Sequence, residues 1–305
     1  MNIEFQYPSE SGLVSVIITS YKRSFQLVGQ ALESALAQTY SPIEIILVDD
    51  NPNGDPNSLE LQEKLKKYSS VHYIKQPGTT GAQRSRNAGI LASRGEFIAF
   101  LDDDDIWLPE KIAKQVPLFS DPTVGLVYCD GYRFYDNNLD QLIPLRSIRP
   151  FVPEVTFKME LAADRIGTVT QAVIRRSCFE KVGLFDEDLQ VRQDYEMWLR
   201  TTKVFRAAGT PEYLFLYRKH RGAQITKNLQ GALDAYRIIE NKYGNDYHSD
   251  PAALSSMLYE AGWAPVFTHH KKYRIRFWIR SFFVSPKKFF EISKREFSRK
   301  YGHKK

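Results

Sequence analysis

Residues 95–105 read GEFIAFLDDDD, an apolar, strand-like run followed directly by four carboxylates, Asp102–Asp105. Packed like charges repel, so a folded chain needs a counter-charge to hold them together at a strand end. A divalent cation is the best candidate, because hard ions such as Mg²⁺ take oxygen ligands and keep waters or phosphates in the remaining positions. Asp102 and Asp104 are therefore predicted to clamp a metal ion and a diphosphate. The alternative is a solvated acidic turn that caps the next helix, because Asp is a good N-cap.

Short apolar runs alternate with helical patterns on both sides of this segment. In the first half, strands are predicted over 14–18, 43–48, 71–74, 97–101 and 124–128, with helices over 25–38, 59–68, 82–92 and 108–119. The second half is less regular, with strands over 168–175 and 213–218 and helices over 178–182, 194–202, 229–243 and 251–268. This alternation predicts an α/β fold with a mostly parallel sheet flanked by helices.

The bulk properties are those of a globular protein. The chain of 305 residues is 43% hydrophobic and 26% charged. No apolar run approaches the roughly 20 residues that span a bilayer. The first residues, Met1–Phe5, lack the basic and apolar regions of a signal peptide, so we expect a cytoplasmic location. Cys129 and Cys178 fit a reducing compartment and are expected to be buried, inert thiols.

The net charge of +6 is unevenly distributed. Residues 271–305 contain thirteen Lys/Arg and two Asp/Glu, a charge of +11, so the preceding 270 residues carry −5. A mildly acidic body argues against a main domain that binds nucleic acid. Any anionic partner is expected at the C-terminus.

Three polar motifs fall where predicted strands end. Thr19–Tyr21 follows the first strand, Asp49–Asn51 the second and Asp102–Asp105 the fourth. In open α/β sheets ligands bind outside the carboxyl ends of the strands, so parallel neighbours would bring these motifs into one crevice. Asp50 is predicted to accept a hydrogen bond from the N–H of a uracil-type ring. A simple turn before Pro52 is the alternative.

The segment Gly78–Asn87 is a flexible loop that runs into a helix with two arginines. Arginine pairs well with phosphate because its planar fork donates two parallel hydrogen bonds. The loop leads into the helix before the acidic strand, which favours a phosphate-binding role for Arg86. A mobile surface loop with solvated arginines is the alternative.

These motifs together resemble a GT-A glycosyltransferase of family 2, from about Leu13 to about Thr226. The resemblance implies a Rossmann-like GT-A fold, a nucleotide-sugar donor, Mn²⁺ or Mg²⁺ held through the Asp-x-Asp motif, and inversion at the anomeric carbon. Ser85 stands where the family usually has Ala, which leaves Arg86 matched. The motifs that carry the resemblance are VSVIITSY (residues 14–21), LVDDN (47–51), the Gly81–Asn87 segment and FLDDDD (100–105).

The resemblance implies a role for each matched residue in the first half. A UDP-sugar is the favoured donor because Asp50 matches a carboxylate that recognises uracil. The other matches are Thr19 and Tyr21 with the loop that contacts the nucleoside, Asp102 and Asp103 with positions near the ribose and diphosphate, Asp104 with the principal metal ligand, and Arg86 with a segment beside the donor.

Two segments of the second half also match the family. Gln193–Arg200 resembles its Glu-Asp-Tyr-Asp-Leu-Trp segment, which implies that Asp194 is the general base for the acceptor hydroxyl. Gln193 replaces the usual acidic neighbour and is expected to lower the pKa of that base. Helix capping is the alternative role for Asp194, and both roles can coexist. The segment 217–221 resembles Tyr-Arg-x-His, which implies that His220 approaches the metal or the diphosphate, an ordinary polar surface residue being the alternative.

The expected organisation is a catalytic domain over residues 1–226, followed by a helical, basic and aromatic region over 227–305. The catalytic domain is expected to have a nucleotide-sugar-binding half (1–130) and an acceptor-binding half (131–226). The expected acceptor is a hydroxyl of a glycan or of a lipid-linked molecule, in surface polysaccharide or glycoconjugate synthesis. The alternatives are a catalytically silent sugar- or membrane-binding module and a nucleotidyltransferase, although Thr19–Arg23 lacks the glycines that the latter would be expected to show.

The C-terminal region interleaves aromatic with basic residues, and Phe290, Phe297 and Tyr301 recur at helical spacing. Helices of this kind lie well in a membrane interface. Anionic headgroups add about 1 kcal/mol per nearby basic residue. We therefore expect peripheral association with the inner face of the plasma membrane through residues 271–305. Aromatic side chains packed on the catalytic body, with the lysines in solvent, are the alternative.

Overall fold

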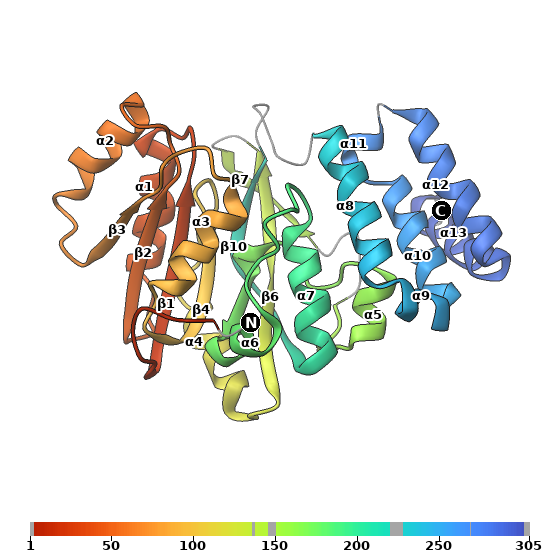
Figure 1. The fold of residues 1–305 in the computed structure, drawn as a ribbon, viewed down its shortest axis with the longest axis horizontal. Helices are drawn as coiled ribbons and strands as arrows, with labels where there is room; N and C mark the ends of the chain where they lie inside the picture. Colours follow the sequence, from red (N-terminus) through yellow and green to blue (C-terminus); the bar gives the residue numbers. More distant parts are fainter. Residues whose placement is uncertain (1–2, 136–137, 146–150, 220–227, 269, 302–305) are drawn as a thin grey trace. The chain divides into compact units, whose positions relative to one another are not determined.

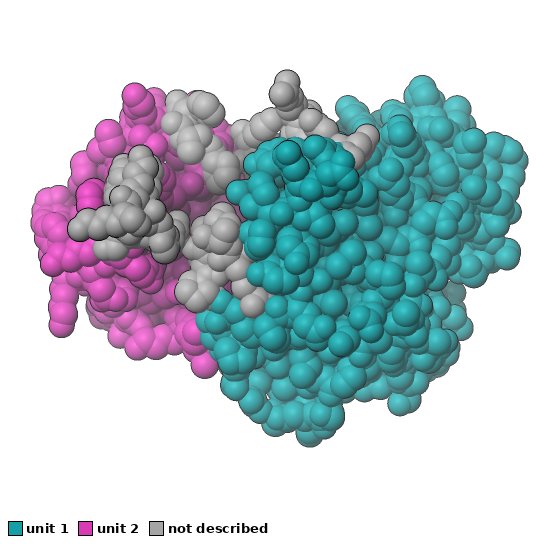
Figure 2. All heavy atoms as spheres, turned by 180° about the vertical axis from the view of Figure 1, so that it is seen from behind, with its two compact units in different colours: residues 1–155, 166–187, 193–222 teal, residues 156–165, 188–192, 223–305 magenta. Residues whose placement is uncertain are grey.

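The computed structural model describes residues 3–135, 138–145, 151–219, 228–268 and 270–301 (Figure 1). The chain divides into two compact units, coloured teal and magenta in Figure 2. Two segments inside the first 222 residues are part of unit 2. Unit 1 consists of Met1–Val155, Ile166–Glu187 and Gln193–Gly222, and unit 2 of Thr156–Arg165, Asp188–Arg192 and Ala223–Lys305.

Unit 1 is built on one 10-stranded sheet with the order β3-β2-β1-β4-β9-β6-β10-β5, in which β7 pairs with β6 and β8 with β10. The strands β3, β2, β1 and β4 run parallel to one another, as do β6 and β10. The strands are β1 (Glu10–Ser20), β2 (Ile43–Asp49), β3 (Val71–Lys75), β4 (Gly95–Asp102), β5 (Ile106–Trp107), β6 (Val124–Tyr135), β7 (Asn138–Pro144), β8 (Glu154–Val155), β9 (Ala172–Arg175) and β10 (Arg206–Lys219). The predicted α/β class is confirmed.

The sheet has more antiparallel pairs than the strand–helix alternation predicts. β9 lies between β4 and β6 and runs antiparallel to both. The predicted strand over 168–175 begins instead with a 3₁₀ turn, η3 (Val169–Gln171). The short antiparallel strands β5 and β8 pair with β10, so the sheet is mixed in its second half.

The expectation that the motif-bearing strands are parallel neighbours is confirmed. β1 lies between β2 and β4, and Figure 1 shows these strands side by side. Their register places Ser20 beside Asp49 and Thr19 beside Asp102. The interior of β1 is buried from Leu13 to Ile18, as expected for a parallel strand that is covered on both faces. The three polar motifs therefore start at one edge of the sheet.

Prolines divide two helices that the sequence pattern predicts as continuous. The predicted helix over 108–119 is instead the short helix α4 and the 3₁₀ turn η1 (Val116–Ser120), because Pro117 has no N–H to continue α4. Pro265 likewise starts a separate helix, α11. The helices of unit 1 are α1 (Phe25–Leu36), α2 (Pro56–Leu65), α3 (Ala82–Leu91), α4 (Lys111–Gln115), α6 (Arg176–Val182) and α7 (Gln193–Val204).

All regular secondary-structure elements in the described residues of unit 2 are helices. None of the helices in the described ranges of the chain is both long and apolar enough to cross a membrane. The helices of unit 2 are α5 (Phe157–Ala162), α8 (Leu229–Lys242), α9 (Gly244–Ser249), α10 (Pro251–Gly262), α11 (Pro265–Thr268), α12 (Lys271–Val284) and α13 (Pro286–Tyr301).

The two cysteines are buried free thiols, as predicted. Burial raises the pKa of the Cys178 thiol to about 12. A thiol is nucleophilic only as its thiolate, so Cys178 is inert at neutral pH.

β6 and β10 approach each other closely at Gly131. A Cβ on this residue would lie 2.4 Å from the Phe215 ring and 2.6 Å from the Phe215 carbonyl oxygen. Phe215 is fully buried, so its ring has no room to move away. We expect Gly131→Ala to lower the free energy of unfolding by about 1–3 kcal/mol, measured by urea denaturation. Gly29→Ala in α1 is the matched control, since its nearest neighbour is the Phe25 ring at 3.2 Å. Equal midpoints for the two variants would contradict the close approach.

Candidate active site

Arginine side chains neutralise much of the acidic run at the end of β4. Asp102 accepts a hydrogen bond from Arg86 Nη2 at 2.8 Å. Arg23 Nη2 donates to Asp104 Oδ2 at 2.8 Å, and Arg23 Nε lies 3.4 Å from Asp103 Oδ1. The protein itself therefore supplies part of the counter-charge that the sequence analysis assigned to a metal ion.

Asp105, the last carboxyl of the run, forms hydrogen bonds that stabilise the fold. Its side chain is fully buried and accepts hydrogen bonds from the Thr170 hydroxyl at 2.7 Å and the Arg218 backbone N–H at 2.9 Å. Arg218 Nε in turn donates to the Asp104 carbonyl oxygen at 2.7 Å. Burial, together with the Asp104 charge, raises the pKa of Asp105 well above its usual range. Asp105 thus ties the end of β4 to η3 and β10.

Asp103 is the second buried carboxyl of the run. Burial and the Asp104 charge raise the pKa of Asp103 to about 7, although Arg23 and the Tyr21 N–H act in the opposite direction. The Tyr21 N–H lies 3.3 Å from Asp103 Oδ2. Near neutral pH the acidic run therefore carries less than its formal four negative charges.

Arg86 is the clearest sign of an anion site among these residues. Its side chain is buried in α3 and stacks on the Phe185 ring, with 5.8 Å from the guanidinium carbon to the ring centroid. Its Nη1 atom is buried and has no hydrogen-bond partner within the described residues. A buried donor without a partner costs free energy. A phosphate oxygen beside Asp102 would give the Nη1 donor of Arg86 a partner.

At the end of β2 the two aspartates differ. The Asp49 carboxylate is fully buried and accepts hydrogen bonds from the Ser58 and Tyr73 hydroxyls at 2.5 and 2.6 Å. Asp49 thus holds the turn. Asp50 Oδ1 accepts from the Thr80 N–H and hydroxyl at 2.9 and 2.7 Å, and Asp50 Oδ2 accepts from the Gly81 N–H at 2.8 Å. A carboxylate has about four acceptor positions, so these three bonds leave Asp50 capacity for one more donor.

The loop after β1 is fixed between the acidic run and the end of β2. The Tyr21 N–H faces Asp103, and the Lys22 N–H donates to Asn51 Oδ1 at 2.6 Å. Lys22 has φ 52°, the left-handed region that side-chain-bearing residues rarely adopt. The predicted nucleoside-binding loop, which contains Thr19 and the exposed side chain of Tyr21, is therefore tied to both motifs.

Asp194 lies in the first turn of α7, where its Oδ1 accepts a hydrogen bond from the Tyr195 N–H at 2.8 Å. Its charge acts on Tyr217 in β10. Burial raises the pKa of Tyr217, and the charges of Asp105, Asp102, Asp104 and Asp194 raise it further. One tyrosine is therefore within electrostatic reach of both Asp194 and the acidic run. The predicted residue His220 lies outside the described residues.

The donor set of the site fits a divalent cation that arrives with a diphosphate. No group of three or more His, Cys, Asp or Glu side chains in the described ranges is arranged to hold a metal ion by itself. The side chains of Asp102 and Asp104 remain 30% and 16% exposed. Two carboxylates, with waters and phosphate oxygens in the remaining positions, are the environment that Mg²⁺ usually takes in proteins.

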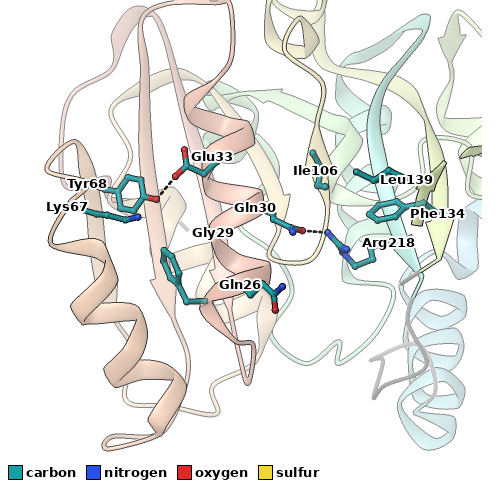
Figure 3. Close-up of a pocket in the computed structure, with 11 residues that line it drawn as sticks. Gln26, Gly29, Gln30, Glu33, Lys67, Tyr68, Ile106, Phe134, Leu139 and Arg218 are labelled. Atoms are coloured by element: carbon teal, nitrogen blue, oxygen red, sulfur yellow. Dashed lines mark hydrogen bonds between the residues drawn. The ribbon is translucent and has the colours of Figure 1, made fainter. Parts of the chain in front are cut away.

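A cavity of about 530 Å³ lies beside α1, and Arg218 is one of the residues that line it (Figure 3). Arg218 Nη2 donates to Gln30 Oε1 at 2.6 Å across it. The aromatic rings of Phe25, Tyr68 and Phe134 also line this cavity. None of the predicted site residues lines it, so the cavity is distinct from the site at the strand ends.

Sequence reasoning missed the two arginines that support the acidic run. The only signal for Arg23 is its place just after the Thr19–Tyr21 motif. Arg218 lies in the segment singled out for His220, but its backbone contact with Asp105 depends on how β10 is placed. Thr170 belongs to a segment that the pattern predicts as a plain strand.

Known proteins are similar to this chain in sequence and in fold. A model of the family described as Glycosyl transferase family 2 matches residues 15–183. An Escherichia coli protein, UDP-Glc:alpha-D-GlcNAc-diphosphoundecaprenol beta-1,3-glucosyltransferase WfaP, is 29% identical over 230 residues, which cover 75% of this chain and 86% of that protein.

Solved structures share the fold at low sequence identity. A crystal structure of S. aureus TarS 1–349 in complex with UDP-GlcNAc matches with a TM-score of 0.66 at 17% identity, over 90% of this chain and 82% of that one. A structure of GalNAc-T7 with UDP, GalNAc and Mn²⁺ matches with a TM-score of 0.60 at 18% identity, over 87% of this chain and 54% of that one. Because the family model covers more than half of its residues and the fold agrees, this chain belongs to glycosyl transferase family 2 and has the GT-A fold.

Proposed function

We propose that this protein is an inverting, metal-dependent glycosyltransferase that moves a sugar from a nucleotide-sugar donor to an acceptor hydroxyl. The observation that carries the proposal is the meeting of three polar motifs, two of them acidic, at one edge of the sheet, together with a buried arginine whose Nη1 has no hydrogen-bond partner in the described residues. A silent sugar-binding module would have no need of a carboxylate such as Asp194, whose charge acts on Tyr217 together with the charges of the acidic run.

On the donor side, the proposed roles divide between nucleoside and diphosphate. Asp50 accepts the N–H of the base with its remaining acceptor position, and the loop with Thr19 and Tyr21 lies against the nucleoside. Arg86 Nη1 donates to the diphosphate while Nη2 stays on Asp102. This arrangement uses the buried arginine without leaving Asp102 unpaired.

Asp102 and Asp104 would hold the cation, with Asp104 as the principal ligand, and Asp103 would lie near the ribose and diphosphate. A bound Mn²⁺ or Mg²⁺ supplies positive charge that stabilises the leaving nucleoside diphosphate. The match to a structure with Mn²⁺ supports a divalent ion, and His220 is proposed as a further group near it. Arg23 pairs with Asp104 in the described structure and has to yield that carboxylate when the ion binds.

On the acceptor side, Asp194 is the proposed general base. A base within hydrogen-bond reach of the attacking hydroxyl typically contributes about 10²–10⁴ to the rate. Asp194 uses Oδ1 on the Tyr195 N–H, which fixes the orientation of the carboxylate at the start of α7. The proposal gives this side chain both roles, the contact with the Tyr195 N–H and catalysis.

A UDP-sugar is the favoured donor and a glycan or lipid-linked hydroxyl the favoured acceptor. The Escherichia coli relative is named for a UDP-glucose donor and a diphosphoundecaprenol-linked acceptor, and TarS was crystallised with UDP-GlcNAc. These names support synthesis of a surface polysaccharide or another glycoconjugate. We also propose that residues 1–226 act as the catalytic domain and that residues 271–305 contact an anionic membrane surface at its cytoplasmic side.

A thermal-shift panel of nucleotide sugars tests the donor assignment. We expect UDP-sugars to raise the melting temperature in the presence of Mn²⁺ or Mg²⁺, and to raise it much less with EDTA, because ligand binding stabilises the folded state. GDP- and dTDP-sugars are the matched controls. A shift for none of the nucleotides would contradict the proposed donor site, and release of UDP from the bound donor in the presence of Mn²⁺ distinguishes an enzyme from a silent module.

A further inference from the structure

The helices α12 and α13 meet at a corner rich in phenylalanine. The sequence across the junction reads FFVSPKKFF, residues 282–290. The Phe282 ring centroid lies 5.5 Å from that of Phe283 and 5.8 Å from that of Phe290. Phe289 lies 5.7 Å from both Phe282 and Phe290. These four rings form one continuous cluster, here named the aromatic corner.

The inner face of α12 is firmly packed within unit 2. Phe277 is buried, with its ring centroid 5.1 Å from Phe267 and 5.2 Å from Tyr236. The Ser281 hydroxyl donates to the Ser255 carbonyl oxygen of α10 at 2.7 Å. The aromatic side chains of the tail therefore divide into two groups, and the first group packs inside unit 2.

The second group faces solvent. All exposed phenylalanines and isoleucines of the described chain lie on these two helices, each at least 50% exposed. On α12 they recur every fourth residue and on α13 every seventh, so each helix presents its apolar residues on one face. These side chains are Ile275, Ile279, Phe283, Phe290 and Phe297.

Each of these five apolar side chains has a basic residue three positions before it. Residues three apart are neighbours on a helix surface, so the outward faces interleave apolar and positive side chains. The pairs are Lys272 with Ile275, Arg276 with Ile279, Arg280 with Phe283, Lys287 with Phe290, and Lys294 with Phe297.

The acidic residues on α13 do not change the sign of this surface. Glu291 pairs with Lys288 at 2.8 Å, and Glu296 lies 3.8 Å from Arg295. Residues 271–297 contain nine Lys/Arg against these two glutamates, and Arg280 also pairs with Glu240 of α8, so the surface keeps a net positive charge. Its partner must therefore offer negative charge together with an apolar layer.

We infer that the outward faces of α12 and α13 bind an anionic phospholipid bilayer, with Phe283 and Phe290 of the aromatic corner inserted below the headgroups. Basic side chains with bulky apolar residues beside them are the composition of interfacial helices. In a symmetric dimer formed through this surface the same patch would face itself, so lysine and arginine side chains of one copy would lie against those of the other and repel them. Ile275 and Ile279 add exposed aliphatic surface, which a bilayer buries and which base stacking does not use.

Vesicle co-sedimentation of the full chain tests this inference. We expect the protein to pellet with phosphatidylcholine vesicles that contain about 30 mol% phosphatidylglycerol at about 50 mM NaCl, and to stay in solution with pure phosphatidylcholine. Raising the salt to about 500 mM is expected to weaken binding, because exposed charges are then screened. The double variant Phe283→Ala/Phe290→Ala should bind at least about tenfold more weakly, because it loses two inserted rings.

Leu59→Ala/Val204→Ala is the matched control, since both side chains are exposed apolar residues of unit 1. This control is expected to bind as the wild type does. Circular dichroism and the melting temperature report whether each variant is folded. Three results would overturn the inference: a wild type that stays in the supernatant, a double variant that binds like the control, or equal binding to neutral vesicles. Because the assay needs no sugar donor, its outcome is independent of the proposed glycosyl transfer.

Discussion

Asp194→Asn is expected to lower the turnover of sugar transfer by about 10²–10⁴-fold while leaving the affinity for the nucleotide-sugar donor nearly unchanged. Asparagine has the shape of aspartate and keeps an oxygen for the Tyr195 N–H, so the start of α7 is preserved. It does not take the proton of the acceptor hydroxyl. Steady-state kinetics of transfer and calorimetry of donor binding measure the two quantities separately.

Two further variants define the meaning of that result. Asp194→Ala removes the capping oxygen as well as the base, so a loss of stability seen in this variant but not in Asp194→Asn identifies the capping role. Asp121→Asn changes an exposed aspartate of the same unit, which pairs with Arg206, and is expected to transfer sugar normally. Near-normal turnover by Asp194→Asn would remove Asp194 from the mechanism.

The second large effect is expected at Asp104. Asp104→Ala should weaken metal-dependent donor binding by about 100-fold or more, because even outer-shell changes at metal sites cost about 10–100-fold. Calorimetric titration of the donor with and without Mn²⁺ measures this loss. Donor affinity that is unchanged by the substitution, in the presence of Mn²⁺, would refute the proposed clamp.

Arg23→Gln is a control at the same carboxylate, with an expected effect on metal affinity opposite to that of Asp104→Ala. Arg23 Nη2 lies 2.8 Å from Asp104 Oδ2, so its guanidinium competes for the oxygen that a cation would take. Glutamine removes the positive charge and keeps a hydrogen-bond donor. In the absence of nucleotide, we expect this variant to bind Mn²⁺ more tightly than the wild type, as followed by electron paramagnetic resonance. Weaker Mn²⁺ binding in both variants would mean that Arg23 stabilises the site instead of competing for it.

The sequence predicts the first half of the fold well because its signals are local. Buried runs such as Val14–Ile18 and the polar residues after them identify parallel strands and the edge where their motifs meet. The β4 strand and the acidic run were both located in this way. The sequence left it as a condition that these strands are parallel neighbours, and the position of β1 between β2 and β4 meets that condition.

The features that sequence reasoning did not find depend on contacts between distant segments. Arg23 reaches Asp104 across 81 positions, and Arg218 reaches Asp105 across 113. No periodicity records such partners, so a cation was the simplest counter-charge to propose. The antiparallel orientation of β9 between β4 and β6 likewise depends on pairing with strands distant in the sequence. For the tail, composition alone left packing and membrane contact as alternatives, and the described side chains divide between an inward and an outward group.

The contacts that Asp102–Asp105 make within the protein have a consequence for how it responds when metal ions are removed. Carboxylates that already have arginine, hydroxyl and amide neighbours do not need an inorganic ion to keep the polypeptide folded. Chelation should then silence sugar transfer reversibly and leave an intact chain that resumes work when ions return. A fall in free Mg²⁺ is then expected to lower the rate of the proposed sugar transfer without unfolding the protein.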